Sequence, residues 1–400
     1  MSVDFQKIFE QIKAIGAGIH EKQESLEERR ALARMLFHLY SDDLEQLRYK
    51  IEAVKAADPS VRCAIPQKEY LDFHTSPSDL PASAVLIAAD GSQIMPDRHS
   101  PIQYGLVNVG AIVMRLNDGE APAIFTESQM LFGDSLFTST GAPLTDGMLA
   151  LMRDTEERSR LLELARQVGS EASPVITFTD GPIELWNLRE GDDAGMFDSH
   201  LQKYLSALTA LQQNGIITAG YIDKPFSDWL VRLLELTQAT DEDIKNLREF
   251  HPLRGVTDRW LVGDEKQPLL GPGERSAVFG LQSRSEKEYQ GALALHFFYI
   301  NVSADERHPK IARVDIPRWV ADDQQKLDNL HAAILQQCRI LGAKPYPYLL
   351  HRAHEIARVS LEEKHQVDQM LQLELRRHGA EIGELSNKQS AKDGQGRTSY

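Results

Sequence analysis

The stretch VLIAADGSQ, residues 85–93, decides how the rest of the chain is interpreted. A short apolar run bounded by turn residues is typical of a buried β-strand. This run ends on the carboxylate of Asp90 and then turns at a glycine. Because burying a carboxylate without a partner is strongly unfavourable, an acid at the end of a core strand needs an explanation.

The same pattern occurs a second time at residues 175–182, VITFTDGP, where the strand ends on Asp180. The glycine after each acid lets the backbone turn or lets another group approach closely. Asp-Gly is also a common turn pair, so the structural alternative is that each aspartate caps a turn. With two strands that each deliver a carboxylate where the chain leaves the sheet, turn capping and a shared cation site both stay open.

Strand and helix patterns alternate from about residue 80 onward, which predicts an α/β fold, a mixed sheet with helices packed on its faces. We expect strands in 83–90, 103–116 (one or two), 174–182 and 216–222, and helices over 145–168, 197–213 and 227–238. Farther along, 277–283 and 292–302 read as two antiparallel strands joined by the charged turn RSEKEYQG, followed by a short strand at 311–317 and helices 320–341 and 348–378.

Residues 3–57 carry apolar residues at helical spacing without a proline, which predicts two or three helices. Residues 58–81 contain Pro, Ser and Asp breakers and are expected to form a linker. We therefore predict an N-terminal helical region with its linker over 1–80, an α/β domain with a helical C-terminal part over 81–385, and a disordered polar tail over 386–400.

The totals exclude several classes of protein. The 400 residues are 42% hydrophobic and 26% charged, enough to bury a sizeable core. The start has no signal-peptide pattern and no apolar run approaches a membrane span, so a cytoplasmic protein is expected. Cys63 and Cys338 are too few for a disulfide framework. The net charge of −15 argues against coating nucleic acid over the whole surface, although it leaves room for a local basic groove.

A metal site at the two strand ends would require a third acid from the helix between them. That helix offers Glu156, Glu157 and Glu163, and spacing alone does not choose among them. Carboxylate oxygens are the ligands that Mg²⁺ and Mn²⁺ prefer, and two such ions about 3.5–4 Å apart serve phosphodiester hydrolysis. A histidine is tolerated as one ligand, more readily around Mn²⁺.

Six motifs in order resemble the NurA-type nucleases, in a form that looks bacterial: AADGSQ, FTDGPI, GYIDKP, GPGERSAVF, ARVDIPRWV and YPYLLHRAHEIA. The resemblance runs from about residue 80 to 380. It implies an RNase H-like core and a Mn²⁺- or Mg²⁺-dependent deoxyribonuclease, with one or two ions per site, that degrades DNA ends as an exonuclease and in some cases as an endonuclease. It also implies a ring-like homodimer that works with a HerA-type hexameric ATPase in end resection, DNA repair or anti-phage defence.

The resemblance also implies roles for particular residues. By position, Asp90 and Asp180 match the metal-binding aspartates, and His354 in RAHE matches the histidine near the metals. The best alignment for the glutamate is Glu156 in MRDTEE, with Glu157 next to it. These four positions would hold the metal ions and form the catalytic centre.

Three further residues would contact DNA. Lys224 in IDKP would stabilise charge on the scissile phosphate, Arg275 in PGERS would clamp a phosphate, and Tyr348 would stack on a base. The alternatives are a surface lysine that opens a turn, a structural ion pair of Arg275 with Glu274 or another acid, and core packing of the tyrosine.

Two other functions remain open from the sequence. One is a non-catalytic nucleic-acid adaptor on the same fold, and the other is a glycosidase that uses two carboxylates without a metal. The sequence contains no G-x-x-x-x-G-K-[ST] loop, so the energy for moving along DNA would come from a separate ATPase chain.

Overall fold

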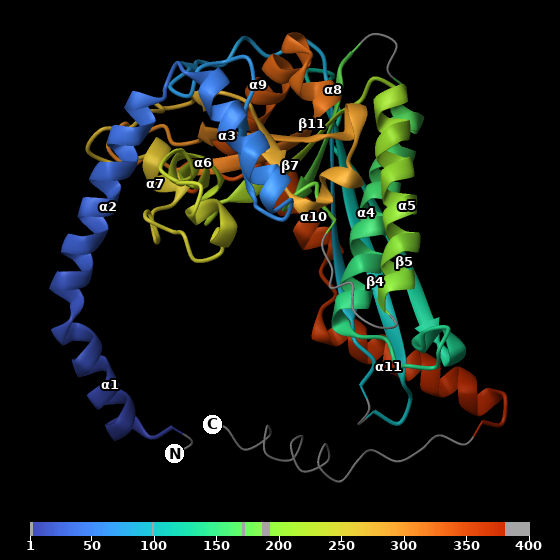
Figure 1. Cartoon of the computed structure of the whole chain (residues 1–400). Helices are drawn as coiled ribbons and strands as arrows, with labels where there is room; N and C mark the ends of the chain where they lie inside the picture. Colours follow the sequence, from blue (N-terminus) through green and yellow to red (C-terminus); the bar gives the residue numbers. More distant parts are fainter. Residues whose placement is uncertain (1–2, 98–99, 170–172, 186–192, 381–400) are drawn as a thin grey trace. The chain divides into compact units, whose positions relative to one another are not determined.

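The computed structural model describes residues 3–97, 100–169, 173–185 and 193–380 (Figure 1). The chain divides into two compact units: a first unit of Met1–Asp79 with Tyr221–Leu335, and a second unit of Leu80–Gly220 with Gln336–Tyr400. The tail 386–400, for which disorder is predicted, lies outside the described residues.

The second unit is built on five neighbouring strands in the order β7-β6-β3-β4-β5. Their bounds are β3 (Val85–Ile94), β4 (Tyr104–Arg115), β5 (Ala123–Phe132), β6 (Val175–Asp180) and β7 (Ile217–Asp223), of which β7 begins in this unit and ends in the other. β3 pairs antiparallel with β4 and parallel with β6, and β4 pairs antiparallel with β5. Three antiparallel strands followed by two strands that each come after a helix make an RNase H-like mixed sheet, which confirms the predicted fold.

Helices flank this sheet. They are α4 (Asp146–Val168), α5 (Asp193–Gln213), α10 (Tyr348–Ala357) and α11 (Leu361–Arg377), with a short 3₁₀ turn η1 (Gly133–Leu136). α4 begins where predicted, because the Thr145 side chain accepts a hydrogen bond from the Met148 backbone N–H at 3.3 Å. It packs on β3 and β4 and runs alongside α5 (Figure 1). α10 also packs on β3 and β4.

Two details of this unit differ from the sequence prediction. The helix predicted over 348–378 is two helices, because Ser360 forms a capping box with Glu363 that begins α11 afresh. β5 is absent from the predicted strands, since nearly all of its residues are exposed and it shows no apolar alternation. Residues 103–116, for which one or two strands are predicted, form one strand of 12 residues, β4.

The first unit begins with three helices, as the spacing predicts. Its helices are α1 (Phe5–Ala17), α2 (Ile19–Leu39), α3 (Leu44–Ala57), α6 (Trp229–Thr237), α7 (Asp258–Val262), α8 (Arg318–Ala321) and most of α9 (Gln324–Ile340), with 3₁₀ turns η2 (Asp243–Asn246), η3 (Arg284–Lys287) and η4 (Gly291–Leu293). Its strands are β1 (Cys63–Pro66), β2 (His74–Thr75), β8 (Arg275–Ser276), β9 (Phe279–Gln282), β10 (Leu295–Asn301) and β11 (Ile311–Pro317).

The strands of the first unit follow the order β1-β9-β10-β11, and β8 pairs with both β10 and β2. The predicted antiparallel pairing of the two strands on either side of the charged turn is confirmed by the register of β9 with β10. In the described part of the chain, no helix has the length and apolar character needed to cross a membrane.

Candidate functional site

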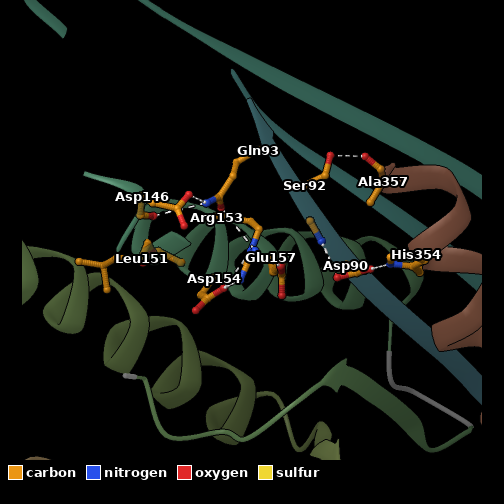
Figure 2. Close-up of polar contacts among 12 residues, drawn as sticks. Asp90, Ser92, Gln93, Asp146, Leu151, Arg153, Asp154, Glu157, His354 and Ala357 are labelled. Atoms are coloured by element: carbon orange, nitrogen blue, oxygen red, sulfur yellow. Dashed lines mark hydrogen bonds and ion pairs between the residues drawn. The ribbon is translucent and has the colours of Figure 1, made fainter. Parts of the chain in front are cut away.

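The end of β3 presents one side of the strand to α10. Asp90 and Ser92 lie on this side because side chains two apart in a strand share a face. The Asp90 carboxylate, only 16% exposed, contacts His354 with 2.7 Å between Oδ2 and Nδ1. The Ser92 hydroxyl donates a hydrogen bond of 2.5 Å to the carbonyl of Ala357, at the end of α10 (Figure 2). The strand therefore holds both an acid and the helix that carries the histidine.

Neighbouring β4 fixes α10 further. Asn108, opposite Ser92 in the register, donates to the same Ala357 carbonyl at 2.7 Å and accepts from the Ser128 hydroxyl of β5 at 2.6 Å. Gly110 lies opposite Asp90, and a Cβ there would overlap the backbone nitrogen of Ala357. The glycine is thus required for α10 to approach closely enough to place its histidine beside Asp90.

The other side of β3 faces α4. Gln93 donates a hydrogen bond of 2.7 Å to the Asp146 carboxylate at the start of that helix (Figure 2). A Cβ at Gly91 would overlap Arg153 and lie 2.7 Å from Oε1 of Glu157. The glycine after the strand acid, which the sequence presents as a possible turn former, is the position where α4 meets the strand.

Three carboxylates gather around this point: Asp90, Asp154 and Glu157, here called the acidic cluster. Arg153 pairs with Asp154 at 2.8 Å and with Glu157 at a longer 3.4 Å. Burial raises the pKa of Glu157 well above its usual range, and the negative charges of Asp154 and Asp90 raise it further. Burial likewise raises the pKa of Asp154. The ionised forms of Glu157 and Asp154 are therefore disfavoured without a further positive charge nearby.

A second arginine lies deeper in the fold. Arg158 is buried and donates to the hydroxyls of Thr218 at 2.9 Å, Tyr204 at 3.0 Å and Thr179 at 3.1 Å. Its charge lowers the pKa of Glu157, against the larger effect of burial. Arg158 therefore links α4 by hydrogen bonds to β6, β7 and α5, one helical turn after Asp154.

Asp180 lies next to Asp90 by register. β3 and β6 are parallel, and their last recorded pair is Ala89 with Thr179, so the two aspartates occupy the following position on adjacent strands. Neighbouring strands are about 4.8 Å apart, and equivalent positions face the same side of the sheet. The two strand-end acids, 90 residues apart in sequence, thus come from neighbouring strand ends.

The three glutamates of α4 have different surroundings. Glu156, the position favoured by the sequence alignment, pairs with Lys203 of α5 at 2.6 Å. Glu163 is exposed and pairs with Arg160 at 2.6 Å. Only Glu157 belongs to the acidic cluster. Sequence reasoning did not single out Arg153 or Asp154, although both precede the glutamates in MRDTEE.

The remaining predicted residues lie elsewhere. Arg275 is completely buried and pairs with Glu69 at 3.0 Å, so it is not free to clamp a phosphate as predicted. The pair with Glu69 matches the alternative that the sequence left open, a structural ion pair with Glu274 or another acid. Lys224 follows β7, is exposed and has a left-handed backbone with φ of 47°. Tyr348 is the first residue of α10 and is half-buried.

The donor set suits a hard divalent cation, since it offers carboxylate oxygens and one imidazole. Within the residues that the structure describes, no three His, Cys, Asp or Glu side chains stand close enough together to hold a metal ion as they are placed. A cation bound here would lower the raised pKa values of Glu157 and Asp154 by stabilising their ionised forms.

The fold and the strand-end acids define an RNase H-like protein with an acidic centre. The chain matches the family model described as the NurA domain over residues 84–359, more than half of its length. The chain therefore belongs to the NurA domain family, which confirms the resemblance seen in the six motifs.

Solved structures give a weaker likeness. The NurA nuclease from Sulfolobus solfataricus is 14% identical, with a TM-score of 0.48 over 93% of this chain and 98% of that chain. A second NurA structure is 10% identical, with a TM-score of 0.41 over 75% and 91%. The catalytic domain of human Endonuclease V is 13% identical, with a TM-score of 0.30 over 82% and 98%. No curated protein matched the chain. With every TM-score below 0.5, the family assignment depends on the family model.

Proposed function

We propose that this protein is a divalent-metal-dependent deoxyribonuclease that hydrolyses phosphodiester bonds at DNA ends. The observation that carries the proposal is the contact of Asp90 with His354, together with the buried Glu157, whose pKa is raised by burial and by the charges of Asp154 and Asp90. Membership of the NurA domain family supports the proposal, as does the name nuclease given to the Sulfolobus solfataricus structure.

The residues that would hold Mn²⁺ or Mg²⁺, one or two ions, are Asp90, Asp180, Glu157 and His354. Glu157 takes the place of Glu156 in this assignment, because Glu156 is neutralised by Lys203 and lies apart from the cluster. When bound, a divalent cation supplies the Lewis acidity that activates a water molecule and neutralises charge on the phosphate.

His354 has a defined part in this arrangement. A neutral imidazole that donates its Nδ1 proton to Asp90 keeps the lone pair on Nε2. Its side chain is 67% exposed, so Nε2 can take a ligand from the solvent side. Asp90 would thus orient the histidine through one carboxylate oxygen and could still offer an oxygen ligand to the metal ion. Carboxylates that orient a metal-binding histidine are common.

DNA contacts are assigned to Lys224 and Tyr348. Lys224 holds a left-handed backbone that non-glycine residues seldom adopt, and such outliers are frequent at functional sites. Its ammonium group would stabilise negative charge on the phosphate. Tyr348, at the start of the helix that carries His354, would contact a base.

The partner and the assembly are also proposals. Since the sequence lacks a phosphate-binding loop of the G-x-x-x-x-G-K-[ST] type, a HerA-type hexameric ATPase would drive movement along DNA. The chain would act as a homodimer in end resection, repair or anti-phage defence.

The test is digestion of end-labelled linear DNA in Mn²⁺, in Mg²⁺ and in EDTA, with wild-type protein and Asp90→Asn. We expect cleavage with a divalent cation, none in EDTA, and none by the variant, whose thermal unfolding should match the wild type. Digestion in EDTA, or by Asp90→Asn at the wild-type rate, would contradict the proposal. DNA binding without cleavage in any metal would instead indicate the adaptor.

A further inference from the structure

A pocket in the first unit plays no part in the proposed nuclease chemistry. It has a volume of about 630 Å³, within the range of small-molecule sites. It lies at the end of β9 and at the charged turn that the sequence analysis identified as RSEKEYQG. Its lining includes the side chains of Lys55, Gln282, Arg284, Lys287 and Arg318.

The lining of this pocket is strongly cationic. Four positive side chains, those of Lys55, Arg284, Lys287 and Arg318, face a single acid, Glu286. Lys55 uses that acid, with 2.7 Å between Nζ and Oε1. Arg284 forms no ion pair within the described residues. In a chain of net charge −15, this pocket therefore concentrates positive charge.

The other two cations are only weakly compensated. Lys287 lies 3.6 Å from Glu288, and Arg318 lies 3.7 Å from Asp322. Both ion pairs are long, and both cations are well exposed, so they contribute little to stability and give way easily to a better partner. The pocket can thus present three cationic groups to an anion.

A buried neutral group also lacks a partner. Gln282 is 1% exposed and lines the pocket, and its amide donates to the Pro59 carbonyl at 3.3 Å. Its carbonyl oxygen Oε1 has no hydrogen-bond partner among the described residues. A buried acceptor without a donor is unfavourable, and native proteins seldom leave one unless a ligand or solvent completes it. Because Gln282 lines the pocket, this unpaired acceptor lies next to its cations.

We propose that this pocket binds a mononucleotide unit, either free or at the end of a DNA strand. Arg284 and Lys287 hold the phosphate through charge-assisted hydrogen bonds, and the planar guanidinium suits a bidentate contact. Gln282 Oε1 accepts from an amino group of the base. The pocket uses no metal and no member of the acidic cluster, so this inference stands or fails separately from the nuclease proposal.

The test is calorimetric titration of the full-length protein in EDTA with dAMP and with inorganic phosphate. We expect dAMP to bind and Arg284→Ala to weaken its binding about tenfold or more, because a charge-assisted hydrogen bond is lost. The matched control is Arg307→Ala, an exposed arginine outside the pocket, which should leave the affinity unchanged. Absence of dAMP binding at millimolar concentration, or equal binding by both variants, would overturn the proposal.

Gln282→Leu separates the base from the phosphate. It should weaken dAMP binding about tenfold and leave the weaker binding of inorganic phosphate unaltered, since only the base contact is removed. Equal losses for both ligands in a variant that unfolds at the wild-type temperature would overturn the assignment of the base to Gln282. If Gln282→Leu does not fold, the dAMP affinities of Arg284→Ala and Arg307→Ala still test whether the pocket binds the nucleotide.

Oligonucleotides with and without a 5′-phosphate distinguish the two sources of the nucleotide. Displacement of dAMP by the phosphorylated strand alone assigns the pocket to a strand end. No displacement by either strand assigns it to a free mononucleotide. Both results support the proposed chemistry.

Discussion

Two buried acids of the first unit, Glu235 and Asp315, are neutralised differently from the acidic cluster of the second unit. In the first unit, Arg232 pairs with Glu235 at 2.6 Å and Arg313 pairs with Asp315 at 2.8 Å, all nearly inaccessible to solvent. Each of these acids has its own arginine at short distance. In the acidic cluster of the second unit, Asp154 and Glu157 share Arg153, while Asp90 turns to His354.

The difference indicates what each set is for. Glu235 and Asp315 are each matched with one arginine, because an unmatched buried charge is destabilising. In the acidic cluster, burial together with the charges of Asp154 and Asp90 raises the pKa of Glu157, so its ionised form lacks a sufficient positive partner. Perturbation of this kind is typical of functional sites, and here a divalent cation would complete the balance.

The largest effect should come from breaking a matched pair. Arg232→Met leaves Glu235 buried without its arginine, with a longer contact to His251 at 3.4 Å remaining, so we expect a loss of about 3–5 kcal/mol in the free energy of unfolding by urea denaturation. Arg153→Met, at a half-buried arginine of the acidic cluster, is the control and should lose less. A larger loss in the free energy of unfolding for Arg153→Met than for Arg232→Met would contradict the distinction between matched pairs and the acidic cluster.

A pH titration of stability sharpens the comparison in the first unit. Burial, with a smaller effect of the nearby Arg275 charge, lowers the pKa of His331 from 6.5 to about 4. The folded state thus binds fewer protons than the unfolded state between these values, so stability is full above pH 6.5 and is lost as the pH falls toward 4. The lost amount is about 3 kcal/mol.

The control for this titration is His331→Gln, because the difference between the two proteins cancels other groups. Asp258 acts in the opposite direction: burial raises its pKa to about 7, so its contribution falls as the pH rises from 3.8 toward that value. The difference between wild type and His331→Gln should change between pH 4 and 6.5. A difference independent of pH would contradict the assignment.

Adjacent glutamates on α4 test the second unit. Glu157→Gln should slow DNA cleavage by about 100-fold or more, because a cluster carboxylate is lost, and should not lower stability, since like-charge repulsion is relieved. Glu156→Gln, which removes only the exposed pair with Lys203, should cleave at close to the wild-type rate. If Glu156→Gln cleaved DNA more slowly than Glu157→Gln, Glu156 would be the glutamate of the metal site.

The smallest effect concerns the placing of α10. Gly110→Ala should push Ala357 and its helix away from β4, with a loss of about 1–3 kcal/mol in stability and slower cleavage, because His354 leaves Asp90. Gly105→Ala, on the same strand, is the control, since its nearest neighbour would be an ordinary contact at 3.5 Å. Equal effects in unfolding and cleavage assays would show that the close approach at Gly110 does not matter.

Local pattern accounts for the parts that were predictable. A buried strand that ends in Asp-Gly is visible in the sequence, so Asp90 and Asp180 could be identified before their register was known. The alternation of strands and helices likewise predicted the mixed sheet. β5 was missed because its exposed side chains leave no apolar alternation to detect.

Tertiary contacts decide the parts that were not predictable. The choice of Glu157 over Glu156 depends on how α4 is rotated against β3, which the contact at Gly91 sets and helical spacing does not. The partner of Arg275 is Glu69, 206 residues away, so no local motif could distinguish a buried ion pair from a phosphate clamp.

The most direct test of the central claim is a titration of the intact protein with Mn²⁺, in which free Mn²⁺ is followed by electron paramagnetic resonance. The account predicts one or two bound ions in the wild type and in Glu156→Gln, and binding about tenfold or more weaker in Asp90→Asn. Equal Mn²⁺ binding by wild type and Asp90→Asn would contradict it.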